Sequence, residues 1–268
     1  MNLAHISVIA SDLDDTLLRK DGTISDATLA LFARWEALGN RLIIATGRPT
    51  RSARATLAPI LAHVPLICYN GAVAFENGDT IYEQYIPGPD VQTLVERLLA
   101  RAPKARVGLE IDDQLFLNQE PPRSPLSGHT VVDLRTVSHR PAAKILLRHS
   151  QADLLGDALD DLPDSVQIMV SNRYDLIQIM PAGVDKAHAL AVLVARWGLG
   201  LENVVAFGDD VNDVRMLKQC GLGVAVSNAV PEVLAAADHI TGTPEEDGVG
   251  MVVEELLIEN GNLRFEKF

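Results

Sequence analysis

The chain has 268 residues, of which 47% are hydrophobic and 22% charged, so it has ample material for the core of a globular protein. Its 36 acidic and 23 basic residues give a net charge of −13. This acidity argues against nucleic acid or an acidic membrane as a non-specific partner, because both need a basic surface. A small anionic substrate remains compatible with it, since local cations and a metal can overrule the overall field.

The cysteines and the first residues indicate a compartment. Cys68 and Cys220 each lie in or beside an apolar run and have no CxxC neighbour, which predicts buried free thiols in a reducing environment. The first residues lack the basic and apolar regions of a secretory signal, and no apolar run reaches the ~18 residues of a membrane span. We therefore expect a cytoplasmic protein with no membrane partner.

A cluster of carboxylates follows the first predicted strand. Residues 5–11 form an apolar, β-branched run that ends in Asp12, Asp14 and Asp15, as a buried parallel strand does when its carboxyl end opens into a polar site. Asp12 and Asp14 can turn toward one point while Leu13 faces the core. Carboxylates this close take up protons unless a cation holds them ionised, and oxygen ligands favour Mg²⁺ over Zn²⁺. A solvated acidic turn is the alternative interpretation.

The second predicted strand ends in residues suited to phosphate. After a helix over 25–39, the buried strand 41–45 runs into Thr46, Gly47 and Arg48. A hydroxyl, a glycine and the N-terminus of the next helix, expected over 51–61, together form a phosphate seat. Thr46 has a simpler alternative role as the N-cap of that helix.

The third predicted strand completes the first half of an α/β sheet. Residues 66–69 lead into Asn70 and Gly71, and a hairpin then turns at Asn77 and Gly78. Asn70-Gly71 has two interpretations: a contact with the substrate phosphate, or simply a turn. The order strand, helix, strand, helix, strand predicts a doubly wound parallel sheet.

The pattern changes over residues 85–181. A helix over 91–100 is followed by short strand-like segments, among them 131–134, and by a proline-rich loop over 120–125. Short strands with few helices predict an inserted α+β domain. The α/β core would then comprise residues 1–84 and 182–268.

The second half of the core repeats the design of the first. A helix begins at Lys186, and the predicted strand 201–207 ends in a segment that contains Asp209, Asn212 and Asp213. The carboxyl ends of parallel strands lie at one edge of the sheet, so residues almost 200 positions apart can share a pocket.

These motifs, taken in order, are similar to those of the haloacid dehalogenase superfamily of phosphohydrolases, in its Cof-type branch (subfamily IIB) with a C2-type cap. The motifs are DxDxT at 12–16, the threonine motif at 43–48, Asn70-Gly71, Lys186, GDxxND at 208–213 and Asp247-Gly248-Val249. The resemblance covers the whole chain and implies a Rossmann-like core with an inserted cap that selects the substrate.

The resemblance also implies roles for the site residues. Asp12 would be the nucleophile that forms an aspartyl phosphate, and Asp14 the general acid and base. Thr46 and Lys186 would hold the phosphoryl oxygens. The implied Mg²⁺ ligands are Asp12, Asp14 through its backbone carbonyl, Asp209 and Asp213, the last with orienting Lys186 or a metal-bound water as its alternative role. The implied substrate contacts are Thr46, Gly47, Arg48, Asn70, Gly71, Lys186 and Asn212.

The sequence departs from the family at Asp15, where glycine is commonest, and we expect a surface residue there because aspartate tolerates turns. The predicted activity is hydrolysis of a small phosphorylated metabolite, such as a sugar phosphate, by a monomer or weak homodimer. Three alternatives remain open: a phosphomutase of the phosphomannomutase type, a phospho-acceptor signalling module and an inactive binding protein. Asp14 and the inserted domain argue against the signalling module, and the retained motif residues against the inactive protein.

Overall fold

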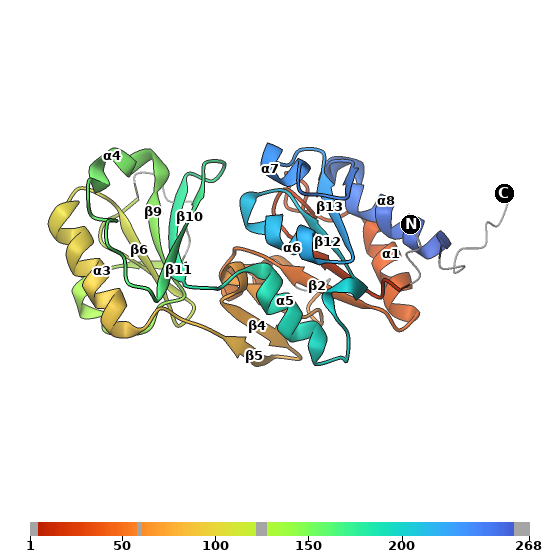
Figure 1. Cartoon of the computed structure of the whole chain (residues 1–268), viewed down its shortest axis with the longest axis horizontal. Helices are drawn as coiled ribbons and strands as arrows, with labels where there is room; N and C mark the ends of the chain where they lie inside the picture. The colour runs from red at the N-terminus through yellow and green to blue at the C-terminus, as the bar shows by residue number, and fades with distance from the viewer. Residues whose placement is uncertain (1–4, 58–60, 122–127, 260–268) are drawn as a thin grey trace. The chain divides into compact units, whose positions relative to one another are not determined.

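The computed structural model describes residues 5–57, 61–121 and 128–259. The end of the helix predicted over 51–61 and most of the proline-rich loop fall outside these residues. The chain divides into two compact units (Figure 1). The first comprises Met1–Gly47, Ala53–Tyr82 and Asp185–Phe268, and the second Arg48–Ser52 and Glu83–Val184.

The first unit is built on an eight-stranded sheet in the order β14-β13-β12-β1-β2-β3-β4-β5. Its strands are β1 (Val8–Ser11), β2 (Arg41–Ala45), β3 (Leu66–Cys68), β4 (Val73–Glu76), β5 (Asp79–Glu83), β12 (Val204–Gly208), β13 (Leu222–Val226) and β14 (His239–Thr241). The strands from β14 to β3 pair in parallel, and β3 and β4 pair antiparallel. Because β1 lies between β12 and β2, the residues that follow these three strands meet at one edge.

Helices contact one another in pairs around this sheet. Helices α1 (Asp26–Ala37) and α8 (Gly248–Glu259) pack together, as do α5 (Lys186–Ala195) and α6 (Val214–Gln219). Two further helices are α2 (Thr50–Leu57) and α7 (Pro231–Leu234). Ser25 is the N-cap of α1, since its hydroxyl accepts a hydrogen bond from the Thr28 amide at 3.0 Å. The predicted doubly wound α/β core is confirmed.

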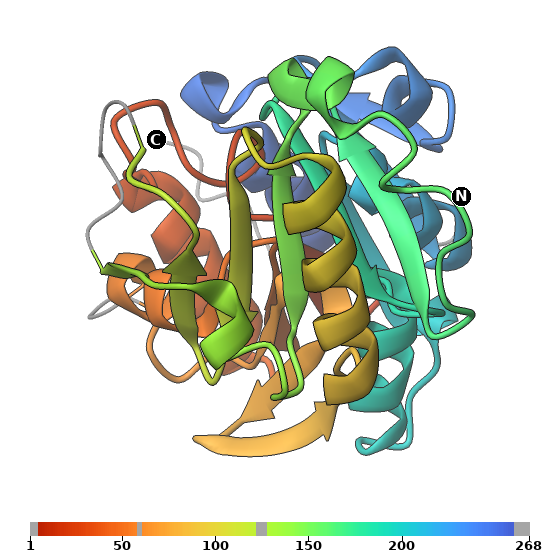
Figure 2. The same cartoon turned by 90° about the vertical axis from the view of Figure 1, so that its left-hand side faces the viewer.

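The second unit has a six-stranded sheet in the order β10-β11-β9-β6-β7-β8, with helices on one face (Figure 2). Its elements are α3 (Gly88–Arg101), β6 (Val107–Ile111), β7 (Gln114–Leu117), β8 (His129–Val131), β9 (Lys144–Arg148), α4 (Ala152–Leu155), β10 (Val166–Ser171) and β11 (Leu176–Pro181). Leu109, Ile145 and Ile179 pack with α3 in this unit's own apolar core. Side chains alternate along strands, so Lys144 and Gln178 belong to the opposite face.

Two strand predictions include residues that form turns instead, for the same physical reason. The segment predicted as a strand over 131–134 leaves β8 at Val131 and becomes a 3₁₀ turn over Leu134–Thr136, where the Asp133 carboxylate accepts from the Arg135 amide. The predicted strand 201–207 begins with a 3₁₀ turn closed by Asn203, whose side chain accepts from the Gly200 amide at 3.0 Å. Short polar side chains that bond the nearby backbone favour turns over strands.

The two cysteines are free thiols, as predicted, with Cys68 buried and Cys220 half-buried. Burial raises the pKa of the Cys220 thiol to about 12, which keeps it protonated at neutral pH. Among the helices that the structure describes, none combines the length and apolar character needed to cross a membrane.

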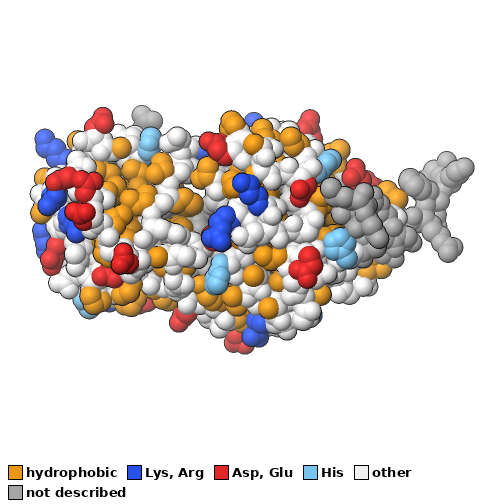
Figure 3. All heavy atoms as spheres, in the orientation of Figure 1, with side chains coloured by type: hydrophobic (Ala, Val, Ile, Leu, Met, Phe, Trp, Pro, Cys, Tyr) orange, Lys and Arg blue, Asp and Glu red, His pale blue; other side chains and the backbone are white. Residues whose placement is uncertain are grey.

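Charged and apolar side chains lie interspersed on the face shown in Figure 3, with a gathering of apolar side chains on the second unit. Strand β10 is at the edge of that unit's sheet, and its Ile168 and Val170 are 38% and 41% exposed.

Gly71 allows a close backbone approach that the fold requires. It has a φ of +104°, and a Cβ added there would lie 2.2 Å from the Asp185 carbonyl oxygen. Gly78 has a similar φ of +89° but open space around it, so it is a matched control.

We expect Gly78→Ala to lower the free energy of unfolding by about 1 kcal/mol, through backbone strain alone. Gly71→Ala should lower it by roughly 3 kcal/mol, because rigid backbone must also move. Urea denaturation measures both, and equal losses would contradict the role assigned to the close approach.

Candidate active site

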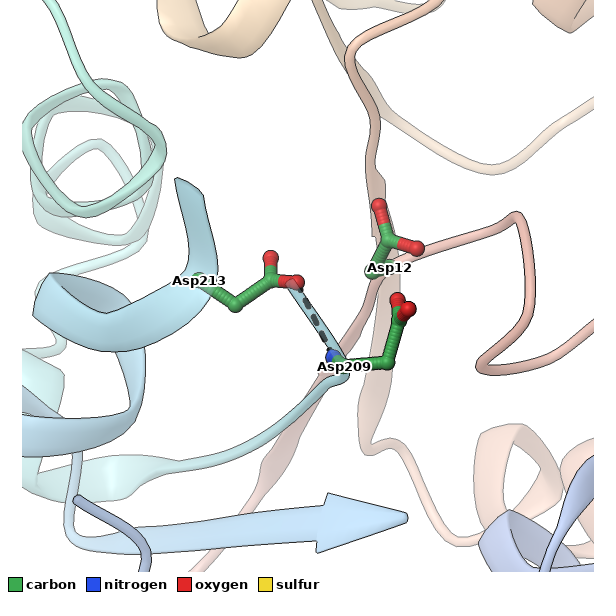
Figure 4. Close-up of side chains that lie close together, drawn as sticks. All are labelled: Asp12, Asp209 and Asp213. Atoms are coloured by element: carbon green, nitrogen blue, oxygen red, sulfur yellow. Dashed lines mark hydrogen bonds between the residues drawn. The ribbon is translucent and has the colours of Figure 1, made fainter. Parts of the chain in front are cut away.

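Three buried aspartates meet beyond the ends of β1 and β12. These strands pair in register at Ser11 and Phe207, which brings Asp12 next to Asp209. Asp12, Asp209 and Asp213 are 5%, 1% and 0% exposed, and one carboxylate oxygen of each lies within 4.8 Å of the others (Figure 4). Such a cluster is unstable unless positive charge compensates it.

Lys186 supplies a positive charge inside this cluster. It is the first residue of α5, whose N-cap Asp185 accepts from the His188 amide at 2.8 Å, and its side chain is fully buried. The Lys186 Nζ donates to Asp12 Oδ1 and, at 2.7 Å, to Asp213 Oδ1. Burial alone would lower the pKa of Lys186, but the charges of Asp12 and Asp213 outweigh it and raise the pKa above its ordinary value. Lys186 is therefore an ammonium at any physiological pH.

The surroundings of Asp12 disfavour the ionised form of its carboxyl group. Burial raises its pKa well above the ordinary value, Lys186 opposes this effect, and the carboxylates of Asp213 and Asp209 add to it. A further cation at the cluster would favour the ionised carboxylate.

Asp213 organises the loop that follows β12. While its Oδ1 accepts from Lys186, its Oδ2 accepts from the amides of Asp209 at 3.1 Å and Asp210 at 3.2 Å. Gly208 must be a glycine, because a Cβ there would lie 2.3 Å from the Asp213 Cβ. The sequence left open whether Asp213 orients Lys186, and the hydrogen bond shows that it contacts the ammonium directly.

Several predicted substrate contacts form one network beyond β2 and β3. Thr46 is buried, and its backbone oxygen accepts from the Asn70 amide at 3.1 Å. A Cβ on Gly47 would lie 2.7 Å from Asn70 Oδ1, and this oxygen accepts from Asn212 Nδ2 at 2.9 Å. Gly71 lies against the start of α5, next to Lys186. The structure thus joins these residues within the first unit, whereas Arg48 belongs to the segment Arg48–Ser52 of the second.

Asp14 is half-buried and lies outside the group of three clustered carboxylates. Its neighbour Asp15 is also half-buried, rather than a simple surface residue. Asp15 has a φ of +56°, and its carbonyl accepts from Asn228 Nδ2 at 2.8 Å. A left-handed backbone at this position explains why glycine suits it and why aspartate is tolerated.

Thr16 received no role in the sequence analysis, although it is the threonine of DxDxT. It is fully buried, and its Oγ1 donates to Asp209 Oδ1 at 2.9 Å. The DxDxT motif could have pointed to Thr16, but its partner Asp209 lies 193 residues further along the chain, so the sequence did not indicate the contact. Thr16 therefore helps to aim the Asp209 carboxylate.

The clustered side chains suit a hard divalent cation. They offer carboxylate oxygens alone, and Mg²⁺ prefers such ligands. Asp12, Asp209 and Asp213 are the residues that could hold it, with Thr16 and Lys186 fixing their orientation.

Comparisons with known proteins place the chain in a family. The model of the haloacid dehalogenase-like hydrolase family matches residues 9–253. The chain is 30% identical to the 5-amino-6-(5-phospho-D-ribitylamino)uracil phosphatase YitU of Bacillus subtilis, covering 92% of this chain and 96% of that protein. The crystal structure of TM0651 from Thermotoga maritima is similar with a TM-score of 0.82 and 27% identity, covering 93% and 97% of the two chains.

The fold also matches the subclass IIB sugar phosphatase BT4131, with a TM-score of 0.81 at 22% identity over 94% of this chain and 99% of that one. The chain belongs to the haloacid dehalogenase-like hydrolases, in their Cof-type branch. It is an enzyme that hydrolyses phosphoric monoester bonds.

Removal of one predicted metal ligand tests the cluster. We expect Mg²⁺ to stabilise the wild-type protein, by about 2.7 kcal/mol at a hundredfold excess over Kd. Asp209→Asn should abolish most of this gain, because it removes a charged ligand from the buried group. Asp79→Asn removes an exposed charge from β5 and is the control. Thermal unfolding with and without MgCl₂ measures the effect, and an unchanged gain in Asp209→Asn would exclude Asp209 as a ligand.

Proposed function

We propose that this chain is a Mg²⁺-dependent phosphatase of small phosphorylated metabolites that acts through an aspartyl phosphate on Asp12. The observation that carries the proposal is the buried Lys186 ammonium, which contacts Asp12 and Asp213 beside Asp209. A fully buried lysine among three buried carboxylates is costly for a purely structural role. It is the arrangement expected where a phosphate dianion must approach an anionic nucleophile.

In the first step, an Asp12 oxygen attacks phosphorus and the bond from phosphorus to the leaving oxygen breaks. Lys186 and the Thr46 hydroxyl would donate to the phosphoryl oxygens as charge develops on them. Bound Mg²⁺ supplies charge compensation between the nucleophile and the phosphate. Asp12, Asp209 and Asp213 would hold that ion.

Asp14 is the proposed general acid and base. Its carboxyl gives a proton to the leaving oxygen, then accepts one from the water that attacks the aspartyl phosphate, so inorganic phosphate leaves and both carboxyls are regenerated. Asp14 is half-buried and is not one of the three clustered carboxylates, and this separate place supports the division of labour.

We further propose a sugar or polyol phosphate as the substrate, selected by the inserted domain over 85–181. The relative YitU is named for a substrate with a phosphorylated ribityl chain, and this chain covers 96% of it at 30% identity. Within the second unit, the buried Lys144 Nζ donates to Gln178 Oε1 at 3.0 Å, on the sheet face that α3 leaves uncovered. A cation and an amide of this kind suit the hydroxyl groups of a sugar.

Phosphate release from a panel of sugar phosphates, nucleotides and p-nitrophenyl phosphate tests the activity. We expect turnover that requires Mg²⁺ and falls by roughly 10⁴-fold or more in Asp12→Asn, which keeps the shape of the side chain but removes the nucleophile. Asp79→Asn should match the wild type. Circular dichroism and Tm check that each variant is folded. Equal turnover in Asp12→Asn would exclude Asp12 as the nucleophile, and no release from any substrate would exclude the phosphatase.

The choice of substrate is tested within the second unit. Lys144→Met should lower kcat/KM for the best sugar phosphate by about tenfold, the typical cost of one lost hydrogen bond to a charged group. It should change kcat/KM for p-nitrophenyl phosphate much less, because that substrate has no hydroxyl groups to recognise. Ile145→Val, at the adjacent position on the helix-covered face, is the control. A uniform loss across substrates would argue against a role in selection.

A further inference from the structure

The segment that carries Asp14 is tied to the C-terminal part of the first unit. We call residues 14–23 the acid-base loop. The Arg19 Nη2 donates to Asp247 Oδ1 at 2.8 Å, and the Lys20 amide donates to Glu245 Oε1 at 3.0 Å. These contacts join positions 228 and 225 residues apart. The acid-base loop is therefore fixed by contacts with Glu245 and Asp247 as well as by hydrogen bonds within the loop.

Within the loop, Arg19 is connected to Asp14 by a short backbone path. Asp14 and Leu18 form an isolated β-bridge, and the Leu18 amide donates to the Leu13 carbonyl at 2.8 Å. Arg19 follows directly, and its amide donates to the Thr23 carbonyl at 2.9 Å. A displacement of Arg19 thus moves the residue paired with Asp14.

The segment that receives Arg19 is itself rigid. Asp247 ends a 3₁₀ turn at a φ of +59°, and Glu246 accepts from both the amide and the hydroxyl of Thr243 at 2.9 Å. The Gly248 amide donates to the Thr243 carbonyl at 3.0 Å, and a Cβ on Gly248 would lie 1.9 Å from the Gly242 carbonyl oxygen. Asp247 therefore presents its carboxylate from a fixed point.

The exposure of this ion pair argues against a role in stability alone. The side chains of Arg19 and Asp247 are 32% and 30% exposed, and pairs in contact with water contribute little to folding. Proton transfer is far more sensitive to small displacements than folding is, because the acid must reach the leaving oxygen at hydrogen-bond distance.

We propose that Asp247 is a positioning residue, which acts through Arg19 to place the Asp14 carboxyl for proton transfer to the leaving group. This inference rests on the proposed function, in which Asp14 is the general acid. Neither Arg19 nor Asp247 needs to touch the substrate.

Leaving groups of graded basicity test the proposal. The value of kcat/KM is measured for substituted phenyl phosphates, from p-nitrophenyl phosphate to phenyl phosphate, with Mg²⁺ present. A general acid matters more as the leaving phenolate becomes more basic. We expect Asp247→Asn to lower kcat/KM by about tenfold or more for phenyl phosphate and to change it little for p-nitrophenyl phosphate. Asp14→Asn should show the same trend more strongly.

Further variants separate positioning from folding. Glu254→Gln removes an exposed charge from α8, the helix that follows Asp247, and should keep the wild-type dependence on the leaving group. Arg19→Gln should reproduce the effect of Asp247→Asn, and the double variant should be no worse than either single one. The double variant Arg19→Asp with Asp247→Arg reverses the ion pair, and it should recover part of the kcat/KM that the single variants lose for phenyl phosphate. Tm with and without Mg²⁺ checks the fold and the metal site of each variant.

The outcomes distinguish this inference from the proposed function. If the wild type releases no phosphate, the proposed function fails. If Asp14→Asn steepens the dependence on the leaving group and neither Asp247→Asn nor Arg19→Gln does, the positioning role is overturned while the phosphatase stands. A uniform loss for all phenyl phosphates likewise overturns it.

Discussion

The ammonium of Lys186, buried between Asp12 and Asp213, is the interaction on which the site depends. Three buried carboxylates would otherwise take up protons and lose the negative charge that the proposed nucleophile and metal ligands need. The same ammonium requires those carboxylates, since burial alone would lower its pKa. Each charge is thus stable only in the presence of the others, and the chain must bring residues 174 positions apart together before any of them is functional.

The sheet makes this assembly possible by its strand order. Because β1 lies between β12 and β2, Asp12, Asp209 and Thr46 follow three neighbouring strands at one edge of the sheet. Two glycines then permit contacts that any side chain would block: Gly208 beside Asp213, and Gly71 against the backbone at the start of α5. The hydrogen bonds of Thr16 and Asp213 fix the direction of Asp209, so the geometry is set before substrate arrives.

Much of this was accessible from the sequence, because it is encoded locally. Apolar strands that end in carboxylates, the hairpin at Asn77-Gly78 and the alternation of strands with helices are short-range signals, and they predicted the α/β core. The bond from Thr16 to Asp209, the double role of Asp213 and the left-handed backbone at Asp15 depend on tertiary partners that no local pattern specifies. The turns at Leu134–Thr136 and Leu201–Asn203 were missed because one polar side chain outweighed a run of apolar neighbours.

The separate apolar core of the second unit has an evolutionary consequence. Leu109, Ile145 and Ile179 fill it together with α3, so the unit does not draw its stability from the buried charges around Lys186. Substitutions on the opposite face of its sheet leave that core intact, and they leave the mutually dependent charges untouched. The residues whose charges depend on one another therefore lie in the first unit, and the opposite sheet face of the second unit can change in sequence without affecting them. Under the proposed role of the second unit in substrate selection, new substrates can be acquired by changes in that unit while the first unit keeps its residues.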